Sequence, residues 1–252
     1  MKAKYIWIGL LSISFCCGHI FAQKPPSRYY GSIDKNKKVF LSKEEVSIQD
    51  YYDILGVLKQ EYGEDSELYR FLIPDTAKFR ELYGFPFFYM KKGVHYKSIE
   101  SNFIREQQRI LPMVAISYEQ VKVCCQLIEE GLNMRDSIRN KSRTKSYTWQ
   151  CSLPEKADYE MALNSKKAEI TQKAALSPLQ VKYTKRRYAI NSYIIKPHYG
   201  NSISGLTDNI AEYMQDGMVV EGGKNTTLKF VEEKDCENPI GFRIKLTVVS
   251  KK

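Results

Sequence analysis

The sequence predicts an α+β domain with two or three helices, short strands and long connecting loops. Two helices begin with clear capping signals, one at Ser47 and one at Ser117. Strand-like alternation is confined to short segments, and no internal repeat, coiled-coil heptad or low-complexity tract is present. The remaining segments are rich in aromatic side chains, which bury large areas and can anchor irregular chain to a core.

The first predicted helix covers residues 48–62. Ser47 and Asp50 have the spacing of a capping box at its start, and Gly63 supplies a stop signal at its end. Side chains at helical spacing are expected to place one face of this helix against the core. That face consists of Tyr51, Ile54, Leu55, Leu58 and Tyr62.

The segments on either side of this helix are less regular. Residues 29–41 alternate enough to predict a strand, preceded by a turn at residues 31–32. Residues 64–75 predict a short helical segment that Pro74 ends. Residues 76–108 are dense in aromatic side chains but follow no clean period, so packing of loops on the core is favoured over a binding groove.

A second helix is predicted to begin after Ser117 and to end at Gly131. Gln120 stands at the return position of its capping box, and a short apolar strand is expected just before it, over residues 111–116. The positions spaced i, i+3, i+4 and i+7 on this helix are expected to face the core. These positions are Val121, Cys124, Cys125 and Ile128.

The C-terminal half contains shorter elements. Residues 147–165 predict a strand, a turn at Leu153 and Pro154, and a short helix over about residues 155–163. A further strand is predicted over residues 188–195, and the rest of this region gives no assignment.

The N-terminal sequence predicts that the protein is exported. Residues 1–22 contain two lysines, then an apolar run, then a short segment that ends at Ala22. This is the pattern of a secretory signal peptide that is cleaved after Ala22. The run is too short to span a bilayer, which takes about 20 apolar residues, and no later segment is long enough. The alternative is a lipoprotein anchored through Cys16 or Cys17. It is disfavoured because small residues normally precede a lipidated cysteine.

The mature chain is therefore predicted to be periplasmic or at the cell surface, without a transmembrane segment. Residues 23–28 form a linker, and residues 29–252 form a single domain. Lys and Arg number 39 against 29 Asp and Glu, and cleavage removes two lysines, which leaves a net charge of about +8. This balance suits an anionic glycan, a membrane surface or nucleic acid, and export disfavours nucleic acid.

Basic residues are densest over residues 135–145 and 185–187. We interpret both groups as solvated loops, because charge runs more often keep a surface hydrated than form a binding patch.

The mature chain has four cysteines, Cys124, Cys125, Cys151 and Cys236. Four cysteines allow three pairings, and the sequence selects none of them. Cys124 and Cys125 point in different directions on a helix and should not pair with each other. We favour a disulfide between Cys151 and Cys236, and the alternative is that the cysteines are buried as small apolar side chains.

Four separated segments, in order, resemble the formylglycine-generating enzyme, or sulfatase-modifying factor, domain family. They are KEEVSIQDYYDIL at 43–55, PMVAISYEQVKVCCQLI at 112–128, SLPEKADYEMAL at 152–163, and GLTDNIAEY at 205–213 followed by VVEGG at 219–223 and IGFRI at 240–244. The segment EYGEDSELYRFLIPD at 61–75 also resembles family members attached to the gliding-motility and type 9 secretion machinery of Bacteroidetes.

This resemblance implies the sulfatase-modifying-factor variant of the C-type-lectin-like fold, which is irregular, with few helices and small antiparallel sheets. It also implies that a set of residues near the C-terminus forms a structural motif. These residues are Asn209, Gly222, Gly223, Gly241, Phe242 and Arg243.

The resemblance also bears on catalysis. Catalytic members bind copper through two cysteine thiolates that lie between the paired glycines and the GFR segment, and such soft ligands suit Cu(I). Between Gly223 and Gly241 this chain has Cys236 alone. A second branch of the family uses a histidine-rich iron site, but the mature chain has two histidines, His95 and His198, without acidic neighbours at ligand spacing. The sequence therefore identifies no catalytic residue.

Family members commonly hold a structural Ca²⁺ in the segment that corresponds to residues 205–213. Glu212 is retained here, Asp208 replaces a glycine, and Gly205 stands where an oxygen-bearing side chain is usual. Asp208 and Glu212 are therefore a candidate calcium corner, since Ca²⁺ accepts irregular oxygen shells. We favour the alternative, a turn in which Glu212 accepts backbone hydrogen bonds.

These observations predict an exported, non-catalytic scaffold or binding protein, a pseudoenzyme with a protein partner in an envelope or secretion assembly. The alternative is a divergent formylglycine-generating oxidoreductase that acts on a peptide cysteine. Glycan binding is a third hypothesis and rests on analogy of fold alone.

Overall fold

The computed structural model describes residues 29–34, 36, 38–88, 111–139, 147–164, 179–183, 186–190, 203, 205–206, 210–222 and 227–250. The predicted signal peptide and linker lie outside the described residues. So do Asp208, Asn209, Gly223, His95 and His198.

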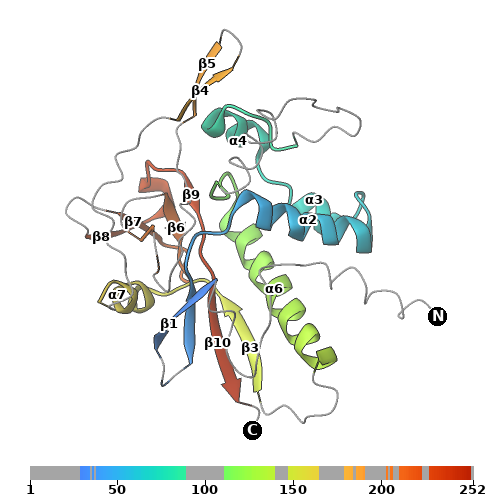
Figure 1. Ribbon diagram of the computed structural model, residues 1–252, viewed down its shortest axis with the longest axis vertical. Coiled ribbons are helices and arrows are strands. Elements are labelled where there is room, and N and C mark those ends of the chain that lie inside the picture. The colour runs from blue at the N-terminus through green and yellow to red at the C-terminus, as the bar shows by residue number, and fades with distance from the viewer. Residues whose placement is uncertain are drawn as a thin grey trace.

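The described residues form an α+β structure with few helices and small, mostly antiparallel sheets, which confirms the predicted class (Figure 1). One four-stranded sheet has the order β1-β2-β10-β3 and a second has the order β8-β7-β6-β9. A two-stranded ladder joins β4 (Leu179–Tyr183) to β5 (Arg186–Ile190). The predicted strand over residues 188–195 overlaps β5 at its start, and residues 191–195 are outside the described part.

The first sheet brings the two ends of the domain together. β1 (Tyr30–Asp34) and β2 (Val39–Ser42) form a hairpin, and β2 also pairs with the C-terminal strand β10 (Lys245–Ser250). β10 pairs on its other side with β3 (Tyr147–Ser152), a strand that the sequence predicted. The last described strand, β10, therefore lies inside the sheet, between β2 and β3.

The N-terminal hairpin corrects the prediction of one strand after a turn at residues 31–32. Gly31 and Ser32 lie inside β1, and the chain reverses after Asp34. The Asp34 carboxylate accepts a hydrogen bond from the backbone N–H of Asn36 at 2.9 Å, a local contact that favours a turn at this point.

The first predicted helix is confirmed as α2 (Ile48–Tyr62), and both hydrogen bonds of its capping box are formed. Tyr51, Ile54, Leu55 and Leu58 are buried as predicted. Tyr62 is the exception, because its side chain is 62% exposed at the end of the helix.

Two short helices follow, α3 (Glu67–Phe71) in the predicted segment and α4 (Thr76–Tyr83), which the sequence analysis missed. The signal for α4 was present, since Asp75 caps it by accepting from the N–H groups of Ala77 and Lys78. Phe79, Tyr83 and Phe87 pack into the core as favoured, whereas Phe88 is 47% exposed. Residues 89–108 are outside the described part.

The long helix α6 (Tyr118–Arg139) begins as predicted, with the Ser117 and Gln120 capping contacts formed. It does not end at Gly131. A glycine inside a helix costs about 1 kcal/mol, and the contacts that Asn133 and Asp136 make with β3 offset that cost. Residues 111–116 are buried as expected, but they form one isolated bridge, at Pro112, and no strand.

The second sheet is formed by β6 (Ala211–Tyr213), β7 (Val219–Gly222), β8 (Leu228–Val231) and β9 (Ile240–Gly241), with β9 parallel to β6. Helix α7 (Lys156–Asn164) confirms the short helix predicted after Pro154. The main core lies under α2, α4 and α6, and a smaller apolar cluster that includes Tyr159 and Ala162 lies under α7. Among the described residues, no helix has both the length and the apolar character needed to cross a membrane.

Candidate functional site

Glu212, from the candidate calcium corner, and Arg243, from the predicted structural motif, meet in a buried ion pair. Glu212 is on β6, and Arg243 follows β9 in the GFR segment. Arg243 Nε donates to the two carboxylate oxygens of Glu212 at 3.2 and 3.1 Å, and Nη2 donates to Oε1 at 2.9 Å. The guanidinium and the carboxylate therefore face each other edge to edge, the geometry of a strong charge-assisted pair.

Other side chains close this buried ion cluster. Arg243 Nη2 lies 3.5 Å from Oε1 of Glu45, and Nη1 donates to the backbone carbonyl of Ser42 at 2.9 Å. The hydroxyl of Tyr159, on α7, donates to Glu212 Oε2 at 2.7 Å. The cluster thus joins the N-terminal segment, α7, β6 and the C-terminal segment.

The cluster is sealed from solvent. Arg243, Glu212 and Glu45 are 0%, 2% and 4% exposed. Burial alone would lower the pKa of the Arg243 guanidinium, but the carboxylates of Glu212 and Glu45 outweigh burial and raise it. Burial and the Glu212 carboxylate raise the pKa of the Tyr159 hydroxyl, which keeps its proton and donates it to the hydrogen bond.

The described contacts of Glu212 are those of an ion-pair and hydrogen-bond acceptor for side chains. Among the described residues, the side chains of Arg243 and Tyr159 donate hydrogen bonds to it. Asp208, the other half of the candidate calcium corner, lies outside the described residues. Within the described part of the chain, no three carboxylate, histidine or cysteine side chains are grouped as a metal site would need.

Two glycines of the resembling segments are required by close packing. A side-chain carbon on Gly241 would lie 2.7 Å from the carbonyl oxygen of Met113 and closer still to Ile210. A side-chain carbon on Gly205, whose φ is +72°, would lie 2.5 Å from Oε1 of Glu45. Gly205 thus makes room for a carboxylate of the buried ion cluster.

The other residues of the predicted structural motif differ in burial. Phe242 is fully buried beside Arg243, whereas Gly222 is exposed at the end of β7. Asn209 and Gly223 are outside the described residues.

Cys236 lies in a separate polar group on the second sheet. Its thiol donates to Oε1 of Glu221, on β7, at 2.9 Å. The same oxygen accepts from the Asn238 amide at 3.1 Å, and Lys229 Nζ lies 3.5 Å from the other carboxylate oxygen. Burial and the Glu221 carboxylate raise the pKa of the Cys236 thiol to about 12. The hydrogen bond from Cys236 in turn lowers the pKa of Glu221. At neutral pH the site is therefore a neutral thiol bonded to an ionised carboxylate.

The structure does not contain the disulfide that we favoured from the sequence. The four cysteines in the described part of the chain, Cys124, Cys125, Cys151 and Cys236, are free thiols. Cys151 is on β3 and faces the core, while Cys236 follows the 3₁₀ turn Glu233–Asp235 and bonds to Glu221. Sequence spacing could not show that these two cysteines have different neighbours.

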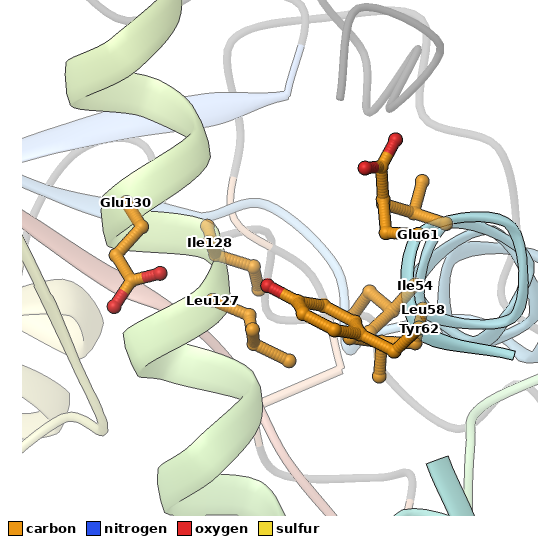
Figure 2. Close-up of a pocket in the computed structure, with 8 residues that line it drawn as sticks. Ile54, Leu58, Glu61, Tyr62, Leu127, Ile128 and Glu130 are labelled. Carbon is orange, nitrogen blue, oxygen red and sulfur yellow. The ribbon is translucent and has the colours of Figure 1, made fainter. Parts of the chain in front are cut away.

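An apolar groove that the sequence analysis missed runs between α2 and α6 (Figure 2). It has a volume of about 40 Å³. Figure 2 shows Tyr62 reaching from α2 across to Leu127 and Ile128 on α6. The groove is lined by Ile54, Val57, Leu58, Glu61, Tyr62, Leu127, Ile128 and Glu130. The signal for it was an aromatic residue on the apolar stripe of α2 at the last helical position, beyond the core.

The described residues of the two basic groups lie in regular elements and not in the loops that we expected. Arg135 is part of α6, and its side chain is 12% exposed and 3.9 Å from Asp136. Arg186 and Arg187 lie in β5. Residues 140–146 and 185 are outside the described part.

Comparisons with protein-family models, with curated proteins and with solved structures found no match for the chain.

Replacing Glu221 by Gln should make Cys236 react faster with iodoacetamide at mildly alkaline pH. The change removes a negative charge and replaces one carboxylate oxygen by an NH₂ donor, so the pKa of the thiol falls from about 12 towards its ordinary value. The thiolate population then rises about tenfold for each unit by which the pKa falls. Peptide mass spectrometry of the native protein, sampled over time, measures the rate at Cys236.

Glu237→Gln is the matched control, because Glu237 is exposed and adjacent to Cys236 in the sequence. If the Glu221→Gln protein were labelled no faster than the Glu237→Gln protein, the proposed effect of the Glu221 carboxylate would be wrong.

Proposed function

We propose that this chain is an exported, non-catalytic binding protein of the sulfatase-modifying-factor family, and that the groove between α2 and α6 holds a protein partner in the cell envelope. The described α+β architecture is compatible with the C-type-lectin-like variant that this family uses. The resembling segments at residues 43–55, 112–128, 152–163 and 205–244 support the family assignment. The single observation that carries the function is the groove itself.

The groove has the character of a protein-binding surface. Tyr62 is 62% exposed although it continues the buried stripe of α2, and Leu127 beside it is half-buried. Tyrosine is enriched among the residues that contribute most to binding, since its ring adds apolar area and its hydroxyl can stay hydrated. A large aromatic side chain over an apolar floor is therefore a natural anchor point.

The size and charge of the groove indicate which kind of partner segment would fit it. A volume of about 40 Å³ is far below the roughly 300–1,000 Å³ of pockets that hold drug-sized ligands. It suits one apolar side chain from another protein. Glu61 and Glu130 lie on the two helices beside this space. The partner segment is therefore an apolar residue flanked by lysine or arginine, whose charge these two carboxylates complement.

The thiol chemistry supports a non-catalytic role. Copper binding of the type found in catalytic members needs two thiolates, and Cys236 is the one cysteine between Gly223 and Gly241. Its thiol is held neutral beside Glu221. The second candidate, a divergent oxidoreductase acting on a peptide cysteine, is favoured by one observation, the partial exposure of Cys236.

A photoreactive phenylalanine analogue at position 62 should cross-link to an envelope protein in the cells that produce the chain. The control carries the same analogue at Glu160, which is exposed on α7, away from the groove (Figure 1). We expect an adduct from position 62, little from position 160, and a cross-linked peptide with an apolar residue next to lysine or arginine. Leu127→Lys should reduce the adduct strongly, because it places a cation in the groove.

Equal yields from both positions would contradict the binding proposal. So would a partner peptide without basic residues, or an adduct with a glycan or a lipid in place of a protein.

The copper-loaded mature protein should leave a cysteine-containing peptide of the sulfatase type unchanged. A chain with one thiol between the two glycines cannot supply two thiolates there. Peptide mass spectrometry and an aldehyde-reactive probe measure the product, and a catalytically competent family member serves as the positive control. Conversion of the peptide cysteine to an aldehyde would establish the oxidoreductase alternative.

A further inference from the structure

We propose that the β4–β5 hairpin docks on an anionic lipid surface through its turn end, which consists of residues 182–183 and 186–187. From the sequence we interpreted the basic group at residues 185–187 as a solvated loop, but two of its arginines lie in β5. The hairpin is separate from the groove between α2 and α6. The proposal therefore goes beyond the proposed function and does not rest on it.

The register of the hairpin gathers three cations at its turn end. Lys182 is paired with Arg187, and Tyr183 is paired with Arg186. Residues that are paired across an antiparallel ladder lie on the same face, and successive residues of a strand lie on opposite faces. The positions of Lys182 and Arg187 therefore share one face of the hairpin, while that of Arg186 is on the other. A surface that meets the turn end can be reached by cations from both faces.

The rest of the hairpin is less charged. The pairs farther from the turn include Leu179 with Ile190 and Val181 with Tyr188, and they share the face of Tyr183. This face changes from apolar residues to a tyrosine and a cation as it approaches the turn. The positive charge of the described hairpin is therefore concentrated at one end.

The pair formed by Lys182 and Arg187 is unfavourable within the protein itself. Like charges directly opposite each other destabilise a ladder, and an isolated two-stranded hairpin is only marginally stable in water. Among the described strands, β4 and β5 pair only with each other. Anionic groups that lie across the two cations offset their repulsion, so a bound anionic surface stabilises the hairpin.

The surrounding sequence contains no acidic residue that could neutralise these cations. Residues 170–207 include six lysine and arginine residues and no aspartate or glutamate, although the whole chain has 29 acidic residues among 252. Figure 1 shows the hairpin at one end of the molecule, away from the two four-stranded sheets. The turn end is therefore placed where it can meet a flat surface.

The residues of the turn end favour a lipid surface over a soluble polyanion. Lysine and arginine are attracted to an anionic membrane without a shaped pocket, because the negative charge is spread over many headgroups. Tyr183 stands among these cations, and tyrosine is enriched at the interface between membrane and water. A soluble polyanion would use the cations but would offer the tyrosine ring no apolar interface.

Co-sedimentation of the mature chain with lipid vesicles tests the proposal. The chain should bind vesicles of equal parts phosphatidylcholine and phosphatidylglycerol, and it should not bind vesicles of phosphatidylcholine alone. Lys182→Gln combined with Arg187→Gln should weaken binding about 30-fold, because each cation near an anionic surface contributes about fivefold. The two changes also remove the like-charge pair, so they should not unfold the hairpin.

The matched control combines Lys156→Gln with Lys234→Gln. Both lysines lie outside the hairpin, and their side chains are 60% and 73% exposed. The control loses the same net charge as the hairpin variant, but charges farther than about 8 Å from the surface are screened at physiological salt. It should therefore bind the vesicles as the wild-type chain does.

A Tyr183→Trp protein distinguishes a membrane from a soluble polyanion. Its fluorescence emission should shift to shorter wavelength with the phosphatidylglycerol vesicles and stay unchanged with polyphosphate. Equal binding to both kinds of vesicle, or no binding to either, would overturn the proposal. So would a control that loses as much binding as the hairpin variant, or an emission shift that polyphosphate produces and the vesicles do not.

Discussion

The contact between Arg243 and Glu212 is the interaction on which the described fold depends most. Removing such charges from water costs several kcal/mol for each ion, so the attraction between them must offset that cost through good geometry. The three hydrogen bonds from the guanidinium to the carboxylate provide this geometry. Glu45 and Tyr159 complete it from two other parts of the chain. Four segments that are far apart in the sequence therefore have to be correctly placed before the charges can be buried.

The residues that hold the fold together and the surface that we propose for binding lie in different parts of the molecule. The C-terminal segments that most resemble a catalytic family carry a buried ion cluster and a neutral thiol, both of which serve packing and hydrogen bonding. The exposed apolar surface lies elsewhere, between α2 and α6. We therefore propose that the chain kept the fold of the family and uses a surface of its helices for binding.

Local signals could be predicted from the sequence, while contacts between distant residues could not. The capping boxes at Ser47 and Ser117 depend on side chains three residues apart, and both helices begin where those signals place them. Gly131 was interpreted as a stop because its local cost is visible, whereas the contacts of Asn133 with β3, which offset that cost, appear only in the folded structure. Glu45 had no local signal at all. Its role depends on two distant residues: Arg243, its ion-pair partner, and Gly205, which leaves space for its carboxylate. Both residues lie more than 150 positions away in the sequence.

A double-mutant cycle between Arg243 and Glu212 tests the central claim most directly. Urea unfolding would be measured for the wild-type protein, Arg243→Met, Glu212→Gln and the double variant. Arg243→Met should cost about 3–5 kcal/mol because it leaves buried carboxylates without a counter-charge. The double variant should be less destabilised than the sum of the single variants by at least about 1 kcal/mol. If Arg243→Met does not fold alone, recovery of folding in the double variant is the corresponding result. Additive effects to within about 0.5 kcal/mol would contradict the account, because independent sites behave in that way.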